Sequence, residues 1–223
     1  MQKLYRKGDT IETTTSYSLI EETWHSITHG IGLLLSVSAL TLLCVFAGQS
    51  GDGTKIASAL VFGLSLIVMY GASTLYHAIR VPKVKSILRQ VDHCAIYILI
   101  AGTYTPISLL GLKGAEGWVL FGIAWAIAAL GIGLKIFYPQ RFHTLALVLY
   151  ALMGWMVIGA IKPLIAHLDI LCLSLLVSGG IIYTVGIIFY VWEKLYFNHA
   201  IWHFFVLGGS IFHFFVVLLL ILK

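Results

Sequence analysis

Three histidines in this chain have the residue type and spacing of metal ligands. His199 and His203 are four residues apart, so on a helix they lie on one face and can bind one ion together. His77 ends a separate apolar run. Three imidazoles with an open fourth position are the ligand count of a catalytic zinc site. We therefore predict that His77, His199 and His203 bind Zn²⁺, provided that the topology brings them together.

Two further residues could act on a water or a substrate beside such an ion. Asp92 begins another apolar run, and its carboxylate could accept a proton from the water or orient a ligand histidine. Ser73 stands four residues before His77, on the same helical face, where its hydroxyl could bind the water or an oxyanion. Taken alone, Ser73 is more typical of a serine bonded to its own helix backbone. We predict catalytic roles for Asp92 and Ser73 as members of this set.

A second polar group opens the first apolar run. Glu22, His25 and His29 are spaced three and four residues apart, so they could line the same cavity as the metal site. They could equally serve as a helix cap, because acidic residues favour a helix N-terminus. Both alternatives are open at this stage.

The composition predicts a membrane protein. The 223 residues are 60% hydrophobic and 10% charged, with a mean hydropathy of +0.97, whereas soluble domains carry roughly 25% charged residues. We expect one integral domain over residues 1–223, in which residues 1–23 form a polar cytoplasmic segment without a cleavable signal peptide. Basic loops facing anionic lipid explain the net charge of +5, so no nucleic-acid partner is expected.

Apolar runs of spanning length predict an all-α bundle of seven transmembrane helices, because backbone groups must be paired inside lipid. The fifth run is the weakest, since Gly154 and Gly159 interrupt it, and Pro106 is expected to kink the third. The predicted spans are about Trp24–Ala47, Thr54–Ile79, Val91–Leu110, Trp118–Phe137, Thr144–Ile161, Ile170–Trp192 and Asn198–Leu222.

The distribution of basic residues predicts the orientation. Of the 14 lysines and arginines, ten fall in the N-terminal segment and the loops on its side, and four fall on the other side. The positive-inside rule then places the N-terminus in the cytoplasm and the C-terminus outside. In this topology His77, Asp92, His199 and His203 all lie at cytoplasmic helix ends, which supports a single site.

These motifs together resemble the hemolysin III family, the bacterial branch of the progestin and adipoQ receptors, related more remotely to alkaline ceramidases. The resemblance covers all seven spans. The motifs that carry it are Glu22 through Gly30, Ser73 with His77, Asp92-His93 followed by Ile100 through Pro106, and His199 with His203. The family commonly has asparagine at the position of His25, where this chain differs.

The resemblance implies a seven-helix fold with a cytoplasmic N-terminus and a zinc ion near the cytoplasmic face. It implies that His77, His199 and His203 are the zinc ligands, that Asp92 contacts the zinc-bound water, and that Ser73 accompanies it. Related receptors and ceramidases are regarded as lipid amide hydrolases.

We therefore expect a multi-pass protein of the bacterial inner membrane that acts as a zinc-dependent hydrolase or sensor of lipids, with an acyl-chain lipid as its partner. Two alternatives are a receptor-like or cytolytic protein with structural zinc, and a metal ion transporter. Intramembrane histidines also mark ion pathways, but beyond the inner third the polar residues are mainly Thr, Ser and Tyr. No oligomeric state is predicted.

Overall fold

A computed structural model describes residues 5–7, 10–12, 17–112, 114–139 and 141–223. Seven helical segments in it are long and apolar enough to cross a membrane, so the predicted all-α, multi-pass architecture is confirmed. The elements are β1 (Tyr5–Lys7), β2 (Thr10–Glu12), α1 (Leu19–Ser50), α2 (Gly53–Ala78), α3 (Pro82–Pro106), η1 (Ile107–Gly111), α4 (Ala115–Phe137), α5 (His143–Trp155), η2 (Met156–Ala160), α6 (Ile161–His167), α7 (Ile170–Val191) and α8 (Asn198–Leu222). Lys3 and Lys113, which entered the charge count, lie outside the described residues.

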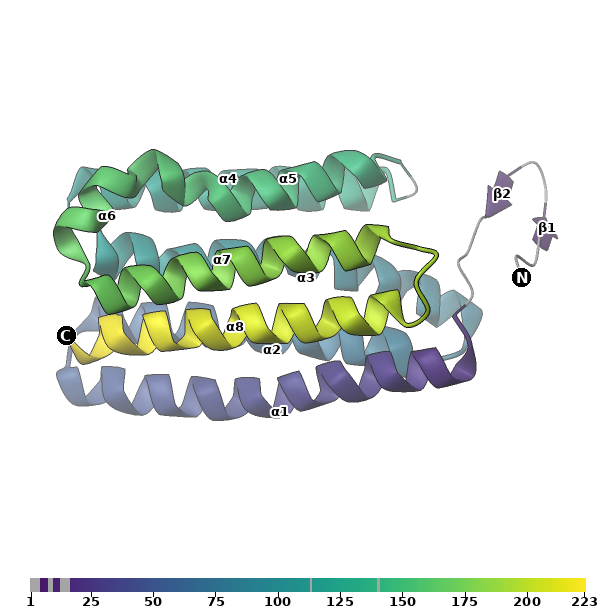
Figure 1. The fold of residues 1–223 in the computed structure, drawn as a ribbon, viewed down its shortest axis with the longest axis horizontal. Helices are drawn as coiled ribbons and strands as arrows, with labels where there is room; N and C mark the ends of the chain where they lie inside the picture. Colours follow the sequence, from purple (N-terminus) through teal and green to yellow (C-terminus); the bar gives the residue numbers. More distant parts are fainter. Residues whose placement is uncertain (1–4, 8–9, 13–16, 113, 140) are drawn as a thin grey trace.

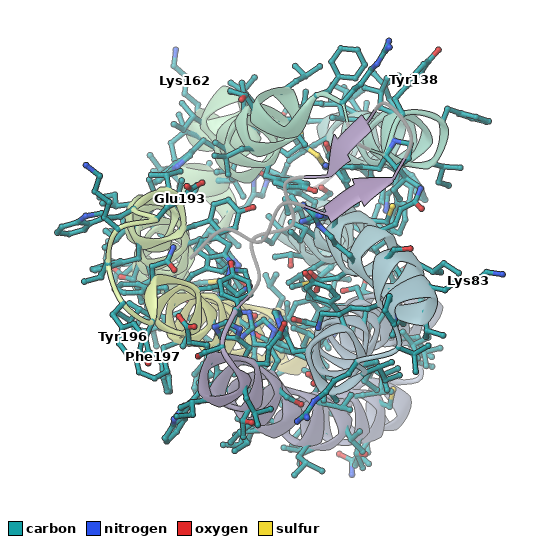
Figure 2. The ribbon with its side chains drawn as sticks, turned by 90° about the vertical axis from the view of Figure 1, so that its right-hand side faces the viewer. Lys83, Tyr138, Lys162, Glu193, Tyr196 and Phe197 are labelled. Carbon is teal, nitrogen blue, oxygen red and sulfur yellow. The ribbon has the colours of Figure 1, made fainter. Side chains whose placement is uncertain are left out.

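The helices form a bundle in which chain neighbours pack against each other and the last helix returns to the first. Helix α1 packs on α2 and on α8, α2 also packs on α3, and α7 packs on α8. The start of α1 and the end of α8 lie at opposite ends of the bundle (Figure 1). Viewed along its axis, the helices surround a central region, and the side chains of Lys83 and Lys162 point away from it (Figure 2).

Two helices begin more than four residues earlier than the hydropathy pattern predicts, and these are corrections. Helix α1 begins at Leu19 rather than at Trp24, because Ser18 and Glu21 form a reciprocal capping box. Helix α3 begins at Pro82 rather than at Val91, with the proline in the first turn, where its missing N–H is not needed. Hydropathy registers only the apolar part of a helix, so polar helical extensions are read as loops. The polar first turn of α3 carries Lys85, which forms an ion pair with Glu22.

The fifth span is broken where its glycines are. Helix α5 ends at Trp155, a 3₁₀ turn (η2) follows, and α6 resumes at Ile161. The Tyr104 hydroxyl accepts a hydrogen bond from the Val157 amide at 2.9 Å and donates one to the Gly154 carbonyl at 3.1 Å. These bonds pair backbone groups that the break would otherwise leave unpaired in lipid. Close to Pro106, α3 similarly passes into the π-helical turn η1.

The half of the bundle formed by α1, α2, α7 and α8 is tightly packed around polar and small residues. The hydroxyls of Tyr70 and Tyr183 both lie 2.7 Å from the Ser210 hydroxyl, which joins α2, α7 and α8. Gly63 of α2 lies so close to α1 that an added Cβ would stand 2.5 Å from the Leu40 side chain and 3.0 Å from its Cα atom. This packing fixes the depth of α1 relative to its neighbours.

Candidate metal centre

The structure brings the three predicted ligand histidines together. His77 lies in the last turn of α2, and His199 and His203 lie in the first two turns of α8. One ring nitrogen from each lies within 4.8 Å of the others. His77 and His203 are buried and His199 is half-buried. Helices α1 and α3 also begin at this end of the bundle (Figure 1).

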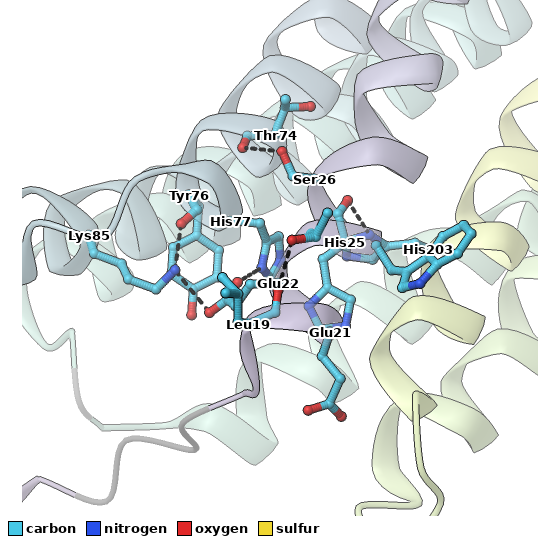
Figure 3. Close-up of polar contacts among 12 residues, drawn as sticks. Leu19, Glu21, Glu22, His25, Ser26, Thr74, Tyr76, His77, Lys85 and His203 are labelled. Carbon is cyan, nitrogen blue, oxygen red and sulfur yellow. Dashed lines mark hydrogen bonds and ion pairs between the residues drawn. The ribbon is translucent and has the colours of Figure 1, made fainter.

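Glu22 holds His77 in place. Its Oε2 atom lies 2.7 Å from His77 Nδ1, and its Oε1 atom lies 3.0 Å from Lys85 Nζ (Figure 3). Lys85 also donates a hydrogen bond of 2.8 Å to the Tyr76 carbonyl. With Nδ1 protonated and bonded to the carboxylate, His77 presents Nε2 as its remaining ligand atom. Helix α1 is capped by Ser18 and Glu21, so Glu22 supports the site and is not the cap.

His203 is oriented in a similar way from α1. Its Nδ1 atom lies 3.1 Å from the Thr28 hydroxyl and 3.2 Å from the His25 carbonyl oxygen. The carbonyl oxygen can accept a hydrogen bond from Nδ1 only if Nδ1 carries the proton, which leaves Nε2 as the free ligand atom of the ring. The first turns of α1 therefore position ligands on both α2 and α8.

Sequence reasoning left the roles of His25 and His29 open, and both prove to be buried within this group. The His25 ring lies 4.7 Å from the His77 ring and 4.8 Å from the His199 ring, measured between centroids. The His29 ring stacks on His203 at 3.5 Å with an interplanar angle of 8°. The spacing of these two residues at the start of an apolar run was the signal in the sequence.

Tyr17, which the sequence analysis did not single out, covers the histidines from the chain preceding α1. Its ring lies 4.7 Å from the His25 ring and 5.3 Å from the His199 ring. Burial raises the pKa of Tyr17 above its usual value, so the phenol remains neutral at physiological pH. A neutral aromatic ring therefore covers this side of the group.

The buried nitrogens of the group are suited to a cation. Among the described residues, His77 Nε2 and both ring nitrogens of His25, of His29 and of His199 have no hydrogen-bond partner. Buried polar atoms are normally paired, and a bound ion is one of the standard reasons for an exception. Imidazole nitrogens are ligands for Zn, Cu, Fe and Ni. The donor set therefore fits a transition metal ion.

A cavity of about 190 Å³ begins beside these histidines and extends between α3, α5, α7 and α8. Ser73, Asp92, His199 and His203 line its polar end. The Ser73 hydroxyl interacts with the Asp92 carboxylate, and the Oδ1 atom of that carboxylate is buried without a hydrogen-bond partner. The rest of the wall is largely apolar, with Leu99, Ile107, Ile161, Leu176, Val177 and Val206 among its residues. The predicted catalytic pair thus shares a cavity with two of the predicted ligands.

Comparisons with known proteins identify the family. The family model for haemolysin-III related proteins matches residues 17–214. The chain is 50% identical to the Hemolysin-3 homolog of Bacillus subtilis (strain 168) over 207 residues, 93% of this chain and 97% of the relative. It is also 50% identical to Hemolysin-3 of Bacillus cereus over 202 residues, 91% of this chain and 92% of the relative.

A more distant relative fits the wider superfamily suggested by the motifs. The human monocyte to macrophage differentiation factor is 28% identical over 183 residues, 77% of this chain and 74% of the relative. The resemblance predicted from Glu22 through His203 is therefore confirmed: this chain belongs to the hemolysin III family.

Proposed function

We propose that this protein is a zinc-dependent hydrolase of long-chain acyl amide lipids. The observation that carries the proposal is the joining of three features in one place: a three-histidine group, an acid–serine pair and an apolar cavity. A three-histidine site with one position for water or substrate is typical of catalytic zinc. The apolar wall suits an acyl chain, whose amide group would then lie at the polar end of the cavity.

The protein's own residues supply the remaining chemistry. When bound by His77, His199 and His203, zinc would polarise the amide carbonyl and acidify a water. Asp92 accepts the proton of the attacking water and later delivers it to the leaving amine, as a general base and then a general acid. Ser73 donates a hydrogen bond to the oxygen on which negative charge develops. The apolar wall orients the acyl chain so that the amide approaches these groups.

The cavity lining favours a lipid over the ion pathway that intramembrane histidines can also indicate. Beyond Asp92 the wall is formed largely by aliphatic residues such as Ile107 and Ile161, together with scattered tyrosine and threonine side chains, Lys135, His93 and His213. A permeating cation would need a continuous line of oxygen or nitrogen ligands. An acyl chain needs none, and gains from the apolar contacts.

Hydrolysis by the purified protein in liposomes tests the proposal. Wild-type protein and the Asp92→Asn, Ser73→Ala and Ser108→Ala variants would be loaded with zinc and assayed on a panel of long-chain lipid amides and esters. We expect Asp92→Asn and Ser73→Ala to retain zinc but to lose about a hundredfold or more in turnover. Ser108 is also a buried serine but does not line the cavity, so its variant is the matched control.

One outcome of the same hydrolysis assay would contradict the proposal. If zinc-loaded wild-type protein hydrolyses no member of the panel, the metal is structural and the protein is receptor-like or cytolytic. In that case the ligand variants lose thermal stability, while Asp92→Asn and Ser73→Ala behave like wild type.

We further propose that the protein resides in the bacterial inner membrane with its N-terminus and the histidine group at the cytoplasmic face. The supporting observation is that ten of the 14 lysines and arginines fall on the side of the N-terminus and four fall on the other side. Reporter fusions at both termini test this orientation. A cytoplasmic signal is expected from the N-terminal fusion only, and a cytoplasmic C-terminus would contradict the proposal.

A further inference from the structure

His25 lies inside the histidine group and not beside it. Its side chain has no exposed surface, and neither of its ring nitrogens has a hydrogen-bond partner. The centroid of its ring lies 4.7 Å from that of His77, 4.8 Å from that of His199 and 5.3 Å from that of His203. No other buried side chain described here approaches all three rings with both of its polar atoms unpaired.

The spacing of the four rings matches that of four imidazoles on one tetrahedral ion. A zinc–nitrogen bond of about 2.0–2.1 Å and a ring radius of about 1.1–1.2 Å place each centroid about 3.2 Å from the ion, so two centroids lie about 5.2 Å apart. The six centroid separations among these rings run from 4.6 to 5.3 Å. The ligand atoms of His25 group with those of Glu22 and His77 and not with those of His199 and His203. Because χ2 of histidine is a broad torsion, the His25 ring can turn with its centre in place and direct a nitrogen towards the ion.

The ring of His29 does not have the spacing expected of a further imidazole on the same ion. Its ring lies parallel to the His203 ring with centroids 3.5 Å apart. Ring nitrogens bind ions in the plane of the ring, so the lone pairs of two parallel stacked rings do not converge on one ion. His29 also contacts Tyr70 edge-on at 5.0 Å, which is a packing contact. His29 is thus a matched control for His25: the same residue type on the same helix, equally buried.

A separate second ion at His25 is disfavoured by the charges around Glu22. Glu22, His25 and His77 also place ligand atoms within 4.8 Å of one another. However, Glu22 Oε2 is bonded to His77 Nδ1, and Glu22 Oε1 is paired with Lys85 Nζ. A second ion would have to break both interactions and sit beside the lysine charge. If His25 binds an ion, that ion is therefore the one held by His77, His199 and His203.

We propose that His25 is a fourth protein ligand of this ion, so that in the resting protein the coordination shell is closed by four imidazoles. The inference rests on the metal site of the proposed function and specifies how that site opens. Structural zinc sites are closed, whereas catalytic sites keep one position open. An incoming carbonyl or water must therefore displace His25 or enter as a fifth ligand. His25 would control access to the ion.

Cobalt substitution tests this coordination without relying on activity. The d–d absorption of Co²⁺ reports coordination number and ligand type, and azide is a small anion that binds at an open position. We expect the Co²⁺ spectrum of wild-type protein to be unchanged by azide. In His25→Ala the spectrum should differ and should respond to azide, whereas His29→Ala should behave like wild type.

Zinc binding and zinc-edge X-ray absorption provide the second readout. Loss of an outer partner of a ligand typically weakens binding by about 10–100-fold, so loss of a ligand should cost at least about tenfold. The fitted number of imidazoles should fall from four to three in His25→Ala. His25→Asn, which keeps polarity without a ring, gives the same result if His25→Ala does not fold.

The failures of the two proposals are distinguishable. One set of results would overturn the role of His25 and leave the metal site intact. In this set, loaded wild-type protein shows three imidazoles and an azide-sensitive Co²⁺ spectrum, and both His25 variants bind zinc with unchanged affinity. Wild-type protein that binds neither Co²⁺ nor Zn²⁺ would overturn the metal site and His25 with it.

Discussion

The two sides of the bundle differ in packing and in chemistry. On one side, α1, α2 and α8 carry the histidine group, and the apolar stretches of α2 and α8 are 56% and 44% buried, although that of α1 is 28% buried. On the other side, the apolar stretch of the broken span of α5, η2 and α6 is only 11% buried. The more buried helices α2 and α8 carry the three proposed ligands, which a metal site must hold to a fraction of an ångström. The less buried span lines the apolar cavity, where the proposed lipid chain would require room and not precision.

The largest effect is expected from removing a ligand on the tightly packed side. His199→Ala should lose stoichiometric zinc, because the i, i+4 pair on α8 is broken and only His77 and His203 of the three-histidine group remain, with His25 as the one further imidazole. Elemental analysis of the purified variant measures this loss. His213→Ala, which removes a histidine about four turns further along α8, should keep its zinc. Full zinc in His199→Ala would contradict the assignment.

A smaller effect is expected from the residue that orients a ligand. Glu22→Gln removes the charge that holds His77 Nδ1–H and Lys85, so zinc affinity should fall by about 10–100-fold. Competition with a chelator measures the affinity. Glu21→Gln is the neighbouring control, since Glu21 bonds the backbone of Ser18 and not a histidine. Equal affinities in the two variants would mean that Glu22 does not tune the site.

A glycine pair compares the packing of the two sides directly. In Gly63→Ala the new methyl group collides with Leu40, including its backbone, and overpacking of this kind costs about 1–3 kcal/mol. Gly159 in the broken span has nothing within 4 Å of an added Cβ, so Gly159→Ala should be neutral or slightly stabilising. Thermal unfolding in detergent measures both. A larger loss of stability in Gly159→Ala than in Gly63→Ala would contradict the predicted difference in packing between the two sides.

The smallest effect is expected at the helix break. Tyr104→Phe removes the hydroxyl that pairs the Val157 amide and the Gly154 carbonyl. Hydrogen bonds between membrane helices contribute about 0.6 kcal/mol on average and at most about 1.7 kcal/mol. The unfolding temperature should fall slightly while zinc affinity stays the same. A change in zinc affinity would show that the two sides are coupled.

Much of the fold could be predicted because it follows from local sequence. The seven spans come from apolar run length, and the weak fifth run coincides with the break after Trp155. Helix ends were less accurate at Leu19 and Pro82, because caps and polar extensions do not register in hydropathy.

The three-histidine group was also accessible from the sequence, since an i, i+4 pair and a topology argument place its members at one end. The supporting residues were not. Whether His25 reaches His203 depends on how deeply α1 sits against α2 and α8, and close contacts such as Gly32 against the Tyr70 ring set that depth. Such contacts are properties of the packed bundle. Lys85 was missed for a related reason, because its helical turn was read as a loop.

The first-turn residues of α1 and those of α8 meet at the histidine group although 178 positions separate His25 from His203. During synthesis, α1 and α2 enter the membrane long before α8 has left the ribosome. Until α8 docks, His77 and its Glu22 partner have no companion imidazoles from that helix, so a half-made chain cannot hold the ion with the full ligand set. On the proposed metal site, loading would therefore follow the docking of α8, and a bound ion would mark a chain whose last helix is in place.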